Sequence, residues 1–144
     1  MGRYISTDIL QQRMGLSRLN GLCGVTGDAQ ETILSGVIAR AEALVESYAA
    51  TRYALPLQSC ELVVEWALRI AEYELYKRTP GDALPQKIKD SYDDALKQLA
   101  ALSSGAVKLV SSTQQAPASS GGTSLSVARP SGQQLFDNSS MGSF

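Results

Sequence analysis

The sequence predicts an all-α fold: a small bundle of three long helices, with short N-terminal helices before it and an extended C-terminal tail after it. Three apolar stripes at helical spacing, each bounded by stop signals, indicate the long helices. From 111 to 144 the chain is mainly Ser, Gly, Gln, Pro and Ala, with Arg129 and Asp137 as its only charges. We therefore expect a helical body over 1–110 and a docking tail over 111–144.

Two short helices are expected near the N-terminus. The first spans about 8–14, with Ser6 or Thr7 as its N-cap. The second has Ser17 as its cap and ends near Gly24.

The first long helix is expected to begin at Asp28. Asp28 precedes Glu31 by three residues, which is typical of an N-cap with its capping-box partner. The helix should fade near Ala50. Its apolar stripe consists of Ile33, Val37, Ile38, Ala41, Leu44, Val45 and Tyr48.

A tight apolar connector follows over 52–57. Pro56 cannot lie inside a helix, and it favours an extended conformation at Leu55. The second long helix then begins after Ser59, a good cap, and ends at 79–81, which reads Thr-Pro-Gly.

The third long helix is expected from about Pro85, a favourable first-turn residue, to Gly105, a favourable C-terminal cap. The apolar segment 107–110 could form a short strand before the tail begins. Four large aromatic side chains at helical spacing are expected in the core: Trp66, Tyr73, Tyr76 and Tyr92.

The composition argues against an enzyme. The chain has no His, which is the commonest general base and metal ligand. Cys23 and Cys60 are far apart, in no metal-type spacing, and are expected to be small buried thiols. Three carboxylate pairs are assigned to solvated helix faces: Glu42 with Glu46, Glu61 with Glu65, and Asp90 with Asp94. We therefore predict no catalytic residues, no metal and no cofactor.

Charge and hydropathy restrict the partners. The net charge is −1 and the basic residues are dispersed, so no global attraction to nucleic acid or to an anionic membrane is expected. No stretch approaches the roughly 20 apolar residues of a membrane span, and the N-terminus has no signal-peptide pattern. We expect a protein made in the cytosol, without a membrane partner.

Several separated segments carry a resemblance. They are RYALPL at 52–57, AEYELYKR at 71–78 and YDDALKQLAALSSGAVKL at 92–109, together with the pattern of Tyr, Thr, Asp, Ile and Leu within 4–10. The body is similar to the neck proteins of Mu-like tailed phages and prophages, which are small helical head–tail connectors.

This resemblance implies a structural role in the virion neck, for a protein made in the host bacterial cytoplasm. It implies a homo-oligomeric ring, of twelve copies by analogy with the class, beneath the portal protein. The ring would extend the channel through which genomic DNA passes without sequence-specific binding. A stopper or tail-completion protein would then build on it.

The expected partner-binding residues fall in two groups. The connector contributes Arg52, Tyr53, Leu55, Pro56 and Leu57. The tail contributes its few apolar anchors, namely Leu125, Val127, Leu135, Phe136, Met141 and Phe144. An alternative for Arg52 is a cap on the C-terminus of the preceding helix. For the other connector residues the alternative is core and turn, which is the commoner role of such residues.

Two other functions remain open at this point. A stopper or tail-completion protein lower in the neck is one, although the three helical stripes do not fit the β-barrel bodies usual there. The other is a small helical DNA-binding or regulatory module.

Overall fold

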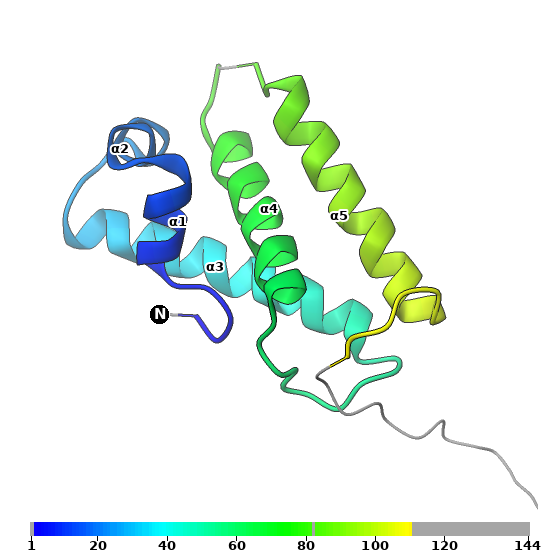
Figure 1. The fold of residues 1–144 in the computed structure, drawn as a ribbon. Coiled ribbons are helices and arrows are strands. Elements are labelled where there is room, and N and C mark those ends of the chain that lie inside the picture. Colours follow the sequence, from blue (N-terminus) through cyan, green and yellow to red (C-terminus); the bar gives the residue numbers. More distant parts are fainter. Residues whose placement is uncertain (1, 82, 111–144) are drawn as a thin grey trace, which may run out of the picture.

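The structure is a computed structural model that describes residues 2–81 and 83–110, and this part of the chain contains five helices and no strand (Figure 1). The helices are α1 (Thr7–Met14), α2 (Leu16–Cys23), α3 (Asp28–Ala49), α4 (Glu61–Arg78) and α5 (Gln86–Ser104). The predicted all-α fold is confirmed. In the described ranges, no helix is long and apolar enough to cross a membrane.

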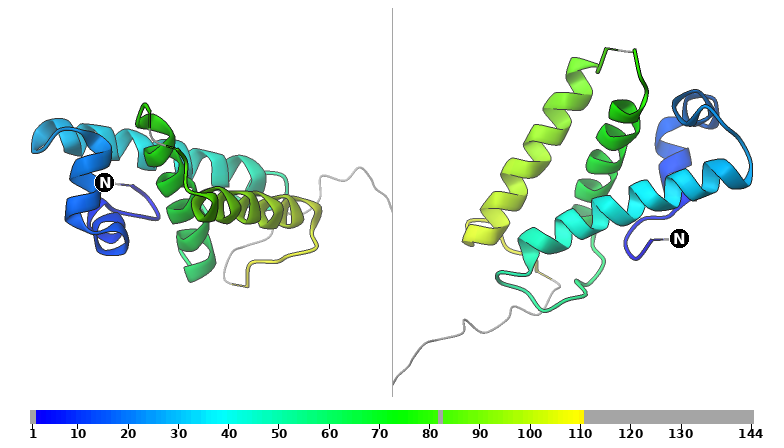
Figure 2. Two further views of the ribbon diagram at one scale, coloured as in Figure 1. Left: turned by 90° about the horizontal axis from the view of Figure 1, so that it is seen from above. Right: turned by 180° about the vertical axis from the view of Figure 1, so that it is seen from behind.

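The three long helices pack on one another. Helices α4 and α5 lie side by side and antiparallel, and α3 crosses both of them (Figures 1 and 2). The short helices α1 and α2 pack on the N-terminal half of α3 and on α4. The two ends of α3 therefore have different neighbours, with the short helices at one end and α4 and α5 toward the other.

The core lies where the long helices meet. Trp66 is fully buried, and its indole Nε1 donates a hydrogen bond to Oε1 of Gln98 at 2.6 Å, which ties α4 to α5. Tyr73 and Tyr92 stack with ring centroids 3.9 Å apart, half-buried between the same two helices. Trp66 is therefore core as expected, whereas the stacked tyrosines close the edge of the α4–α5 contact.

The helix ends differ in detail from the sequence expectation. Ser6 is the N-cap of α1, since its Oγ accepts a backbone amide of the first turn at 3.3 Å. The other predicted N-caps are wrong: Ser17 lies inside α2, Asp28 is the first residue of α3, and Ser59 lies outside α4. Glycines with φ of 87° and 70° precede α2 and α3, and these turns shift the helix starts.

The expected strand at 107–110 is also wrong. Gly105 ends α5 with a φ of 90°, and the chain then turns back toward the body. The backbone amide of Leu109 donates to a side chain, the hydroxyl of Tyr53, and the Leu109 side chain is buried. With no neighbouring strand in the described ranges, the segment is fixed by these contacts instead of a ladder.

Candidate partner interface

Arg52 caps a helix, but not the one that precedes it. Its Nε donates to the carbonyl oxygen of Ser103 at 3.2 Å, and one terminal guanidinium nitrogen donates to that of Ser104 at 3.1 Å. These carbonyls belong to the last turn of α5, where partial negative charge collects. Arg52 therefore fastens the C-terminus of α5 to the connector.

Tyr53 holds the segment that leads out of the body. Its ring is buried, and its hydroxyl accepts the backbone N–H of Leu109 at 2.9 Å. We call Leu109 and Val110, which lead into the tail, the tail root. It is thus anchored at Leu109. Tyr53 serves the fold in this way, and its ring is not available to a partner.

Leu57 is likewise engaged inside the molecule. Its side chain is buried, and its backbone N–H donates to the hydroxyl of Tyr4 at 2.9 Å. The Tyr4 hydroxyl in turn donates to Glu46 of α3. Burial, followed by this contact with the Glu46 carboxylate, raises the pKa of Tyr4. The connector is therefore tied to the N-terminal segment as well as to the tail root.

Glu42 is one of the residues that the sequence analysis placed wrongly. Its carboxylate accepts three backbone amides, from Arg3 at 2.8 Å, Tyr4 at 2.6 Å and Ile5 at 3.0 Å. Only 8% of Glu42 is exposed, so it does not lie on a solvated face. Helical spacing could not reveal this, because the amides come from a segment that lies nearly forty residues away in sequence.

The remaining connector residues face outward. Leu55 is 45% exposed, Pro56 is exposed, and the peptide bond between them is cis. This exposed tip lies between the two anchored residues Tyr53 and Leu57. Of the five predicted connector contacts, Leu55 and Pro56 alone present their side chains freely to a partner.

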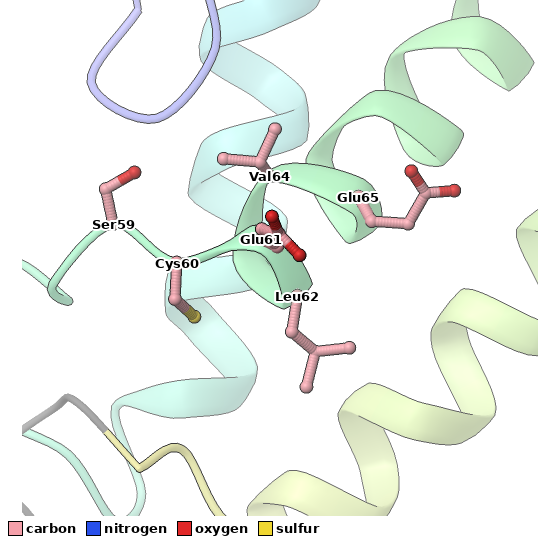
Figure 3. A pocket seen from close by; sticks show the side chains of 6 residues that line it. All are labelled: Ser59, Cys60, Glu61, Leu62, Val64 and Glu65. Atoms are coloured by element: carbon pink, nitrogen blue, oxygen red, sulfur yellow. The ribbon is translucent and has the colours of Figure 1, made fainter.

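Two hollows that share lining residues adjoin the start of α4, and one of them reaches the tail root. We call them together the α4 groove. Its larger part, about 840 Å³, is lined by Ser59, Cys60, Glu61, Leu62, Val64 and Glu65 (Figure 3). A smaller hollow of about 190 Å³ shares Cys60 and Leu62 with it and is completed by Lys108, Leu109 and Val110. In Figure 3, Cys60 and Leu62 point to one side of the helix start, and Ser59 and Val64 point to the other.

An ion-pair network joins α1 to α4. Arg13 reaches Glu65 at 2.7 Å and Glu72 at 3.1 Å, and Arg69 also reaches Glu65 at 2.8 Å. Hydrogen bonding to Arg13, more than to Arg69, lowers the pKa of the Glu65 carboxyl against the opposing effect of burial. Within the described part of the chain, this is the one ion-pair network that attaches a short N-terminal helix to a long helix.

The described side chains do not form a group of three or more His, Cys, Asp or Glu that could hold a metal ion. Burial raises the pKa of the Cys23 thiol, so this thiol is mostly protonated at neutral pH. The predicted tail anchors Leu125, Val127, Leu135, Phe136, Met141 and Phe144 lie outside the described residues.

Comparison with known proteins gives one match. The family model described as "Bacteriophage Mu, Gp36" matches residues 4–127, which is most of the chain. No curated protein and no solved structure matches.

Proposed function

The chain belongs to the bacteriophage Mu Gp36 family, and is thus a phage protein of the structural or morphogenetic kind. From that premise we propose that it is a head–tail connector, placed beneath the portal in the neck of the virion. The body over 1–110 would form a ring that extends the DNA channel, and the tail over 111–144 would bind the portal or a neighbouring subunit. No step in this role requires catalysis.

The observation that carries the proposal is the junction built around the connector 52–57. The N-terminal segment, the C-terminus of α5 and the tail root all attach there, through Tyr4, Arg52 and Tyr53. The exposed tip of Leu55 and Pro56 follows Tyr53, which holds the tail root, by two and three residues along the connector. An exposed apolar tip on the segment that holds the start of the tail is a suitable surface for one large partner.

A second exposed apolar region lies at the far end of α3. Leu16 on α2 and Val25 in the loop before α3 are both exposed. The connector follows the opposite end of the same helix (Figure 1). Exposed apolar side chains near both ends of one helix allow head-to-tail contacts between copies, and such contacts generate a ring when the rotation closes.

The overall charge is compatible with a DNA channel that does not bind its contents. The net charge is −1, which allows a channel wall that is not strongly basic and would not retain passing DNA. A stopper or tail-completion protein would bind the face of the ring that is turned away from the portal.

Native mass spectrometry of the purified chain, alone and mixed with the portal ring of the same phage, tests this proposal. We expect a portal complex that carries a fixed number of copies of the chain, twelve if the ring matches the portal. A chain that stays monomeric or dimeric and ignores the portal would refute the connector role. It would favour a regulatory module, which a gel shift with phage DNA at rising salt would then examine.

A further inference from the structure

The α4 groove is the place where exposed apolar surface and the exit of the tail coincide. Leu62 is 37% exposed and Val110 is fully exposed, and both line the smaller hollow together with Cys60. Val110 is also the last described residue before 111–144. Part of the uncovered apolar surface of the body therefore lies where the tail begins.

The groove carries two charges that no other described residue neutralises. Lys108 lies at the smaller hollow and Glu61 at the larger one, and neither forms an ion pair within the described part of the chain. Glu65, by contrast, is already paired with Arg13 and Arg69. A ligand that suits the groove is mainly apolar, with an acidic group that can reach Lys108.

The tail contains one segment of that chemistry. Leu135 and Phe136 are adjacent large apolar residues, and Asp137, the only acidic residue from 111 to 144, follows them directly. We propose that in the free chain the segment 135–137 binds the α4 groove of its own body. Leu135 and Phe136 then cover Cys60 and Leu62, and Asp137 pairs with Lys108.

The choice of the chain's own tail follows from tethering. The residues between Val110 and Leu135 are mostly small and polar, and they can span about 80 Å at 3.3 Å per residue. The entropic cost of closing such a loop grows only with the logarithm of its length. A tethered segment acts at roughly millimolar effective concentration, far above the micromolar concentration of neighbouring chains.

A disulfide trap tests this placement in the full chain. Asn138→Cys keeps Leu135, Phe136 and Asp137 intact and puts a thiol beside them, within reach of Cys60. At about 1 µM protein, mild oxidation should give an intrachain disulfide, seen as a faster monomer band on a non-reducing gel. Adding Cys60→Ser should abolish that band, because buried Cys23 cannot substitute for it.

The matched control has the same tether and the same thiol. In Asn138→Cys with Phe136→Ala the apolar anchor is missing. We expect the link to form about tenfold more slowly, because the docked fraction should fall from roughly nine in ten chains to roughly one in ten. Lys108→Glu, added to Asn138→Cys, should slow formation of the disulfide. Asp137→Lys, added to that double variant, should restore the rate. Restoration by charge reversal is specific to the proposed pairing.

Equal rates with and without Phe136 would overturn the proposal, since they would reflect random collisions of the tail. A link found only between two chains at 1 µM would also overturn it, in favour of a neighbour's tail. The experiment uses the isolated chain, so a negative result would leave the proposed role as head–tail connector standing. Failure to bind the portal would, in turn, leave the docking of segment 135–137 standing.

Discussion

Gly105 packs directly against the guanidinium of Arg52: a Cβ atom at Gly105 would lie 2.6 Å from Cζ of Arg52. Gly105 also has a φ of 90°, which other residues adopt at a cost. Gly105→Ala should therefore destabilise the body by about 2–3 kcal/mol in urea unfolding, because strain and displacement of Arg52 add together.

Gly81→Ala is the matched control, since Gly81 has a φ of 89° with open space around it. It should lose only the conformational part, about 1 kcal/mol. Arg52→Ala in combination with Gly105→Ala should show a loss smaller than the sum of the single losses. Strict additivity would mean that the close approach has no energetic weight.

Tyr4→Phe removes the hydroxyl that accepts the buried amide of Leu57 and donates to Glu46. The unpaired amide should lower the free energy of unfolding by about 1–2 kcal/mol. Tyr48→Phe, at a half-buried position with no hydroxyl hydrogen bond to a described residue, should change it by less than about 0.5 kcal/mol. Similar losses in both variants would contradict the role given to the Tyr4 hydroxyl.

Glu42→Gln should detach the N-terminal segment from α3. The carboxamide keeps one oxygen, which can still accept the amides of Tyr4 and Ile5, but it places an N–H donor against the backbone amide of Arg3, which is itself a donor. We expect a loss of about 2–3 kcal/mol and faster hydrogen exchange at residues 3–5. Glu31→Gln, on the exposed first turn of the same helix, is the control and should leave both nearly unchanged.

The Arg13–Glu65–Arg69 network should make stability depend on acidity. The pKa of Glu65 is lowered in the folded protein, so its contribution is complete above the unfolded value of about 4.3. That contribution is lost as the pH falls through the lower, folded value. Between pH 5 and 3, wild type should therefore lose more stability than Glu65→Gln. Parallel pH curves for the two proteins would contradict the lowered pKa.

Leu55→Ser tests the exposed tip. Because Leu55 is 45% exposed, the substitution should change stability by less than about 0.5 kcal/mol while weakening association with the portal ring at least tenfold. Ala54→Ser, an exposed neighbour, should bind like wild type. Undiminished portal binding by Leu55→Ser would remove the tip from the interface.

The long helices could be predicted from the sequence because their apolar stripes and stop signals are local. Gly105, for example, ends α5 where the pattern places its cap. The helix starts were less predictable, since Asp28 and Ser17 have the chemistry of caps but preceding glycines make the turns. The N-caps predicted from local preference therefore lie one or two residues away from the observed N-caps.

Long-range contacts explain what the sequence could not reveal about the site. Arg52 has the chemistry of a helix cap, but the helix it caps is fifty residues further along the chain. Glu42 looks like a solvated carboxylate until the N-terminal backbone folds over it. The sequence does show that the guanidinium of Arg52 and the carboxylate of Glu42 need hydrogen-bond partners. Which partners they find is set by the topology of the fold and not by sequence spacing.

The bond between Tyr53 and Leu109 has a mechanical meaning. If a partner pulls on the chain beyond Val110, the load meets Leu109 first, before it reaches the last turn of α5. The tension is then shared with Tyr53 and the connector, so the contact at Leu109 must break before the C-terminus of α5 can be peeled open. A pull on the tail is thus borne first by the contact between two distant chain segments, and only afterwards by a helix.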